Sequence, residues 1–212
     1  MKPLRLMLAI VAVLAIPAKA QAPGVSASSF EGRLLSEHNR ERARYGFVAL
    51  TWSPALAQQA AGWAQDLARR GAFEHSRERQ GAGENLWMGT SGYYEPKDMI
   101  GAFVREGQYF RPGKFPDVSI TGNWADVGHY TQLIWPDTKE LGCATASNGT
   151  NDVLVCRYFP AGNMQGQQIP SALNCSATNL AKAAARWLIR CFSSGSCSAK
   201  LRASPSGTNT GS

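Results

Sequence analysis

The sequence has few histidines and lacks two compact motifs of hydrolytic enzymes. Only three of its 212 residues are histidines. It contains neither a Gly-x-Ser-x-Gly nucleophile elbow nor a compact His-Glu-x-x-His zinc helix. The first absence gives no support to a serine hydrolase of the α/β-hydrolase type. The second means that a metal site would have to collect its ligands from distant parts of the chain.

Acidic residues are absent after Gln168, whereas five lysines and arginines lie there. Three more basic residues lie within the first twenty positions. The formal net charge of +7 therefore comes from the two ends, and the stretch 21–167 is close to neutral. Nucleic-acid binding needs a clustered basic face. We therefore expect no nucleic-acid partner for this central stretch.

Long apolar runs are missing except near the N-terminus. Lys2 and Arg5 precede an apolar stretch from Leu6 to Ile16, and small residues follow it. This is the three-part pattern of a cleaved secretory signal, and its apolar part is too short to span a bilayer. We expect residues 1–20 to be a signal peptide and the mature chain to be secreted, either extracellular or periplasmic. About 190 residues then remain, enough for one domain.

Cysteine is scarce, with five residues in the chain, and an odd count leaves at least one without an intramolecular partner. Cys143 and Cys156 are the best pair, because Asn148-Gly149 signals a hairpin and a turn centred between Gly149 and Thr150 would place them opposite each other. A disulfide closing so short a loop stabilises by about 3 kcal/mol. The pairing of the remaining three stays open: Cys175, Cys191 and Cys197.

Apolar periodicity predicts helices and strands in alternation. The expected helices cover 29–45, a segment from Pro54 to Gly71, a segment from Pro96 to before Pro112, and a short segment after His129, and the expected strands cover 83–88, 140–146 and 152–159. This order suggests a central sheet with helices on both sides. His38 lies on the apolar side of the first helix, and we interpret it as structural. The tryptophans, Trp124 included, are expected to lie mostly in the core.

The segment 168–212 differs in composition from the rest. Residues 177–192 predict a basic amphipathic helix, and the Ser/Gly/Thr-rich end predicts a flexible tail. The helix either covers an apolar patch of the main domain or attaches the protein to an anionic membrane or cell-wall surface. The sequence does not choose between these roles.

Two dense motifs resemble a known family. The segment from Gly128 to Trp135 reads GHYTQLIW, and the segment from Val153 to Met164 reads VLVCRYFPAGNM. Together they resemble the signatures of the CAP superfamily, which comprises cysteine-rich secretory, antigen 5 and pathogenesis-related proteins. The resemblance begins near Leu34 and predicts a CAP domain over 29–167. It implies an α+β fold, a three-layer α-β-α sandwich with a central, mainly antiparallel sheet.

The resemblance also implies a cleft with two histidines and two glutamates: His75, His129, Glu84 and Glu106. Two imidazoles with a carboxylate and a water make a plausible site for Zn²⁺ or another divalent cation. Without metal, each glutamate could orient a histidine in an acid/base pair. In the simplest case the four side chains only satisfy one another's hydrogen bonds.

Three functions follow from this cleft. The first is a binding protein that holds a cation and a small lipid, sterol or peptide, with the aromatic residues Tyr93, Tyr94, Tyr109 and Phe110 as a candidate groove. The second is a metal-assisted hydrolase of peptide or cell-envelope substrates, with Glu84 or Glu106 as the base. The third is a structural or interaction module with an inert cleft. The resemblance favours the first, since most of the family has no accepted enzymatic activity.

Overall fold

The computed structural model describes residues 25–172. The helices are α1 (Phe30–Ala43), α2 (Pro54–Arg70), α3 (Pro96–Arg105) and α4 (Gly128–Leu133), with 3₁₀ turns η1 (Glu106–Tyr109) and η2 (Trp124–Val127). The strands are β1 (Thr51–Trp52), β2 (Gly83–Thr90), β3 (Gly113–Lys114), β4 (Glu140–Ser147), β5 (Asn151–Phe159) and β6 (Gln168–Ile169). The predicted signal peptide, the basic helix at 177–192, and Cys175, Cys191 and Cys197 lie outside the described residues.

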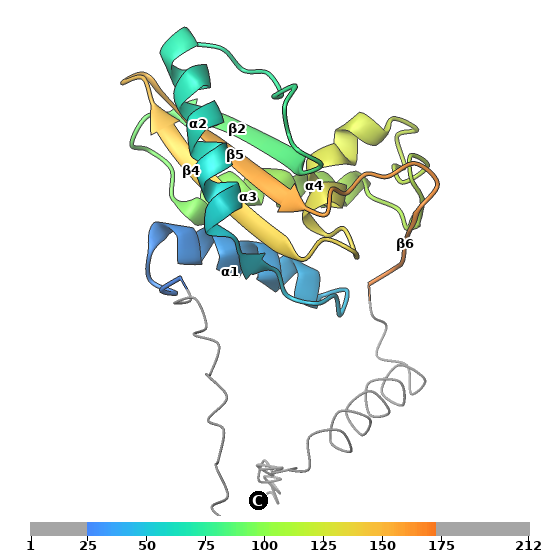
Figure 1. Ribbon diagram of the computed structural model, residues 1–212. Helices are drawn as coiled ribbons and strands as arrows, with labels where there is room; N and C mark the ends of the chain where they lie inside the picture. Colours follow the sequence, from blue (N-terminus) through green and yellow to red (C-terminus); the bar gives the residue numbers. More distant parts are fainter. Residues whose placement is uncertain (1–24, 173–212) are drawn as a thin grey trace, which may run out of the picture.

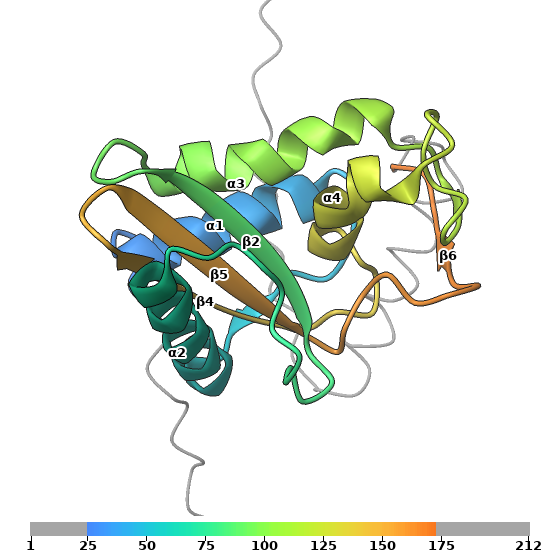
Figure 2. The ribbon, with the colours of Figure 1, turned by 90° about the horizontal axis from the view of Figure 1, so that it is seen from above.

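The central sheet has the strand order β1-β4-β5-β2. β4 and β5 form an antiparallel hairpin, β2 pairs antiparallel with β5, and the short β1 runs parallel to β4. Helix α2 covers one face, while α1, α3 and α4 lie on the other (Figures 1 and 2). The predicted α-β-α sandwich with a mainly antiparallel sheet is therefore confirmed.

Each face of the sheet has its own apolar core, because successive strand residues point to opposite sides. On the α2 side, Ala60, Ala64 and Leu67 pack with Leu86 and Val155. The larger core on the other side includes Leu34, Ile100, Leu133, Leu154 and Tyr158. Strand β5 is thus buried on both faces, which explains its almost unbroken apolar sequence.

The predicted disulfide between Cys143 and Cys156 is confirmed. The two cysteines are direct register partners in the β4–β5 hairpin, with a Cα–Cα distance of 4.1 Å. Gly149 in the connecting turn has a φ of 87°, a conformation that favours glycine. The turn chemistry read from Asn148-Gly149 therefore sets the register that brings the two sulfur atoms together.

Helix ends follow the expected signals with two differences. Helix α2 begins at Pro54 and ends before Gly71, whose φ of 63° is left-handed. Helix α1 ends at Ala43 rather than at Tyr45. Helix α3 ends at Arg105, so Glu106 begins the 3₁₀ turn η1 instead of lying inside a longer helix. Between residues 25 and 172, no helix combines the length and the apolar character needed to cross a membrane.

Candidate functional site

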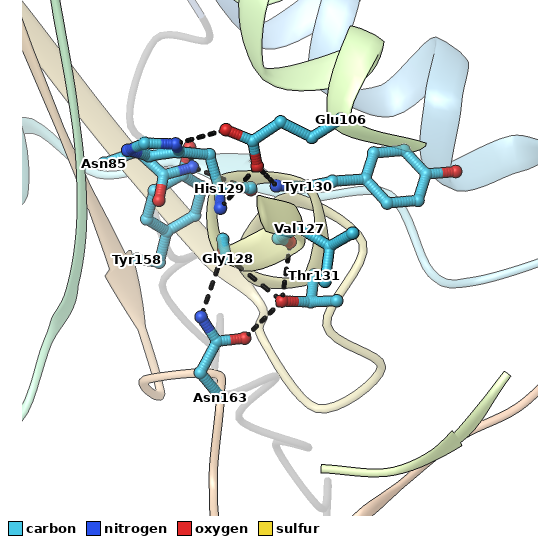
Figure 3. Close-up of polar contacts among 9 residues, drawn as sticks. All are labelled: Asn85, Glu106, Val127, Gly128, His129, Tyr130, Thr131, Tyr158 and Asn163. Carbon is cyan, nitrogen blue, oxygen red and sulfur yellow. Dashed lines mark hydrogen bonds and ion pairs between the residues drawn. The ribbon is translucent and has the colours of Figure 1, made fainter. Parts of the chain in front are cut away.

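His129 lies in the first turn of α4 and is held by Glu106 (Figure 3). Glu106 Oε1 accepts a hydrogen bond from His129 Nδ1 at 2.6 Å, and Oε2 accepts from the backbone N–H groups of His129 and Tyr130 at 2.9 and 3.1 Å. A carboxylate only accepts, so the proton of the neutral imidazole is on Nδ1. The other ring nitrogen, Nε2, remains for a ligand.

His75 repeats this arrangement from a different part of the chain. It lies in the loop between α2 and β2, and its Nδ1 donates to Glu84 Oε1 at 2.7 Å. The same oxygen accepts from the backbone N–H of Ser76 at 3.0 Å. The Glu84 side chain is fully buried, whereas that of His75 is about half exposed (52 %). Nε2 of His75 is therefore also available to a ligand.

The two signature motifs support each other around α4 (Figure 3). Asn163 donates from Nδ2 to the carbonyl of Gly128 at 2.9 Å, and its Oδ1 accepts from Thr131 Oγ1 at 2.7 Å. Asn163 has a φ of 56°, in the region that asparagine tolerates better than most residues. The second motif thus fixes the start of the helix that carries His129.

Strand β2 connects the two halves of the site. Glu84 lies on the α2 face of the sheet and holds His75. The next residue, Asn85, points to the other face and donates to the carbonyl of His129 at 2.9 Å and to Tyr158 Oη at 3.1 Å. Because side chains alternate along a strand, two consecutive residues reach both histidines.

Both histidines line one cleft of about 880 Å³. Its apolar wall includes Phe115, Trp124 and Met164, and its polar side includes Arg77, Arg79 and Gln132. Trp124, which the sequence analysis placed in the core, is 45 % exposed, because η2 sits on the rim and not under it. The cleft therefore joins an apolar wall, a basic side and two imidazoles.

The four predicted site residues form two separate pairs rather than one group of donors. His75–Glu84 and His129–Glu106 are separate pairs, and residues 25–172 contain no group of three or more His, Cys, Asp or Glu side chains placed to hold a metal. Imidazoles that bind a metal commonly donate their second N–H to a carboxylate. Each glutamate occupies the Nδ1 side of its histidine, so the contacts of the two pairs leave Nε2 of each ring free of the carboxylate.

Residues 35–158 match the family model described as "CAP: Cysteine-rich secretory protein family". This chain belongs to the CAP family. The match spans the first signature motif, the start of the second (153–158) and all four predicted site residues.

Similar CAP proteins occur in plants and fungi. Pathogenesis-related protein PR-1 of Medicago truncatula is 30% identical over 142 residues, which covers 66% of this chain and 79% of that protein. Secreted protein RBT4 of Candida albicans is 30% identical over 160 residues, which covers 74% of this chain and 42% of RBT4. This chain therefore spans less than half the length of RBT4, whose name describes it as secreted.

Solved CAP structures share the fold. NaASP2, crystallised with Zn²⁺, aligns with a TM-score of 0.57 at 24% sequence identity, covering 73% of this chain and 90% of that one. BmVAL-1 aligns with a TM-score of 0.54 at 24% identity, covering 73% and 87%. At these identities the likeness establishes the CAP fold alone.

The aromatic residues of the predicted groove lie near the two ends of α3. Tyr93 and Tyr94 pack edge-to-face, and Tyr94 packs in the same way against Trp87. Phe110, beyond the other end of α3, packs against Tyr45 and Tyr130 beside the core. Tyr93 and Tyr94 line a cleft of about 370 Å³ together with Trp87, and neither Tyr109 nor Phe110 contributes to that cleft. The cleft beside the histidines is the better candidate for ligand binding.

We expect Glu106→Gln to destabilise the domain by about 1–2 kcal/mol. Glutamine keeps the shape, but its –NH₂ would face either His129 Nδ1–H or the backbone N–H groups, and donors cannot pair with donors. Urea unfolding would measure the change. Glu74→Gln, at a side chain that is 60% exposed, is the control and should stay within about 0.5 kcal/mol of wild type. Equal stability of the two variants would contradict this role of Glu106.

Proposed function

We propose that this chain is a secreted CAP-domain binding protein whose cleft holds a divalent cation, with Zn²⁺ as the first candidate, and accepts a small lipid, sterol or peptide. One observation carries the proposal. Glu84 and Glu106 each occupy the Nδ1 side of one histidine, so both Nε2 atoms are left for a ligand in the same cleft. Secretion is supported by the N-terminal pattern at 1–20 and by the name of the relative RBT4.

His75 and His129 would be the protein ligands of the cation. Neutral imidazole nitrogen is a good ligand for Zn²⁺, and the carboxylate on the far nitrogen raises its basicity and fixes its orientation. Water or a donor of the bound molecule would complete the coordination. When bound, such an ion supplies Lewis-acid polarisation of an oxygen in the ligand.

The walls of the cleft suit a ligand with an apolar body and a polar end. Phe115, Trp124 and Met164 offer apolar area, whereas Arg77 and Arg79 offer donors to a carboxylate or a similar group. Lipids, sterols and peptides all include molecules of this kind. The two imidazoles line the same cleft as these side chains, so the ligand and the cation would share it.

A hydrolase is less well supported, because a general base needs a free oxygen facing the substrate. Both oxygens of Glu106 accept hydrogen bonds from His129 or Tyr130. Glu84 is fully buried and lies between His75 and Arg157. These contacts fit carboxylates that orient histidines, and they favour binding over turnover. An inert cleft remains the alternative that the following experiment tests.

Calorimetric titration of Zn²⁺ into metal-stripped protein tests the cation site. We expect the His75→Ala/His129→Ala variant to bind at least about a hundredfold more weakly, because loss of a ligand costs more than loss of its hydrogen-bond partner. Tyr93→Ala, at a tyrosine that is 77% exposed and outside the cleft, is the matched control and should bind as wild type does.

Unchanged affinity in the double variant would place bound Zn²⁺ elsewhere on the chain. Absence of binding by the wild type would remove the cation from the proposal. The ligand would then be sought with fatty acids, sterols and peptides alone, and a change in tryptophan fluorescence that is lost in Trp124→Phe would report occupation of the cleft.

A further inference from the structure

A buried arginine stands behind the carboxylate that holds His75. Arg157 on β5 is the direct register partner of Glu84 on β2, and both side chains face the α2 side of the sheet. Arg157 is 2% exposed, and its Nη2 lies 3.1 Å from Glu84 Oε2. The angles make this contact an ion pair without a hydrogen bond. The order of contacts is therefore Arg157, Glu84, His75, cleft.

Glu84 and Glu106 are held in place by different contacts. The Glu84 side chain has no solvent exposure, and Arg157 lies at the oxygen that does not contact His75. Glu106 is 23% exposed and accepts from two backbone N–H groups. The two histidine–glutamate pairs thus look alike at the imidazole but are stabilised in different ways.

The guanidinium of Arg157 makes few other polar contacts in the described structure. Within residues 25–172, its Nε and Nη1 have no hydrogen-bond partner, and Glu84 is its one acidic partner. Burial lowers the pKa of Arg157 and the Glu84 carboxylate raises it. Arginine nevertheless stays charged at neutral pH. Its main electrostatic interaction in the described structure is therefore with Glu84.

We propose that Arg157 is a positioning residue of the cleft. Its guanidinium holds Oε2 of Glu84 from behind, so that Oε1 stays at Nδ1 of His75 and Nε2 of His75 is presented to the cleft as an acceptor. An oxygen held at Nδ1 accepts a hydrogen bond there, and this favours the tautomer that carries the proton on Nδ1. The inference deepens the proposed cation site, and its metal-binding consequence rests on that proposal.

Nitrogen-15 NMR of the imidazoles in metal-free protein tests the tautomer directly. At a pH where the rings are neutral, we expect wild-type His75 and His129 to carry the proton on Nδ1. In Arg157→Met, His75 should shift toward the Nε2–H form, while His129 stays unchanged as the internal control. An unchanged His75 in folded Arg157→Met would overturn the proposal.

A double-mutant cycle on Zn²⁺ affinity provides a second test. Its decisive comparison, the double variant against Glu84→Gln, does not need the Arg157→Met single variant to fold. We expect Arg157→Met and Glu84→Gln each to weaken binding about tenfold. Glu84→Gln/Arg157→Met, which removes both buried charges, should bind no more weakly than Glu84→Gln alone. A further loss in the double variant would show that Arg157 acts by another route. If wild type binds no Zn²⁺, the proposed cation site fails, while the NMR result still decides the role of Arg157.

Discussion

Arg42→Met is expected to lower the free energy of unfolding by about 4 kcal/mol, because it leaves a group of buried carbonyl oxygens without donors. Arg42 on α1 is fully buried. Its guanidinium donates to the carbonyls of Val48, Leu133, Trp135 and Thr138 at 2.7–3.2 Å. Burial lowers the pKa of Arg42 to about 10, so the group stays charged at neutral pH. Methionine fills similar space but satisfies none of these acceptors.

The loss of Arg42 would also affect the site. The carbonyls of Leu133 and Trp135 lie at and just beyond the end of α4, the helix that carries His129. Urea unfolding followed by tryptophan fluorescence would measure the loss. Arg40→Met is the matched control, because Arg40 lies on the same helix with a side chain that is 68% exposed. We expect it to change stability by less than about 0.5 kcal/mol. If Arg42→Met lowers the free energy of unfolding by less than about 1 kcal/mol, water molecules or a local rearrangement must satisfy these carbonyl oxygens in place of the arginine.

The second large effect is a pH dependence that comes from His38. This histidine is fully buried in α1, donates from Nδ1 to the carbonyl of Leu34, and accepts at Nε2 from Tyr158 Oη, both at 2.8 Å. Burial is the main cause that lowers its pKa from 6.5 to about 4, and the positive charge of Arg42 lowers it further. The folded protein therefore resists protonation of His38, whereas the unfolded chain does not.

The sign follows from the two pKa values. Well above pH 6.5 His38 is neutral in both states and adds no pH dependence. As the pH falls toward 4 only the unfolded state binds the proton, so stability falls, by about 2.5 kcal/mol at pH 4.5. We expect the stability difference between wild type and His38→Gln to shrink by that amount between pH 7.5 and 4.5, as measured by urea unfolding. A constant difference would mean that His38 gains a compensating partner when protonated.

The fold was predictable from the sequence because its main signals are local. Pro54 and Gly71 mark the ends of one helix, and Asn148-Gly149 sets a hairpin register that places Cys143 opposite Cys156. The site residues came from the resemblance to the CAP family. Their spacing alone does not connect histidines that lie more than fifty residues apart in the chain.

The supporting contacts were not predictable, because they depend on register and on distant loops. Nothing in the sequence relates Arg157 to Glu84 until β2 and β5 are paired, although a charged residue inside an apolar strand is a signal that it needs a partner. Trp124 was wrongly placed in the core, since composition does not show which aromatic residues lie on a rim. The role of Asn163 likewise appears only when β5 and α4 are brought together.

The placement of Glu84 and Asn85 on consecutive positions of β2 has a consequence for how this protein can change. Both histidines are anchored to one strand, while Arg77 and Arg79 of the cleft lie on the preceding loop. Substitutions of Arg77 and Arg79 can alter which ligand is accepted without changing Glu84 or Asn85. A single-residue deletion inside β2 would instead exchange the two faces, and would release the His75 imidazole and the His129 carbonyl at once. Ligand preference can therefore change through the side chains of that loop while both contacts of β2 are kept.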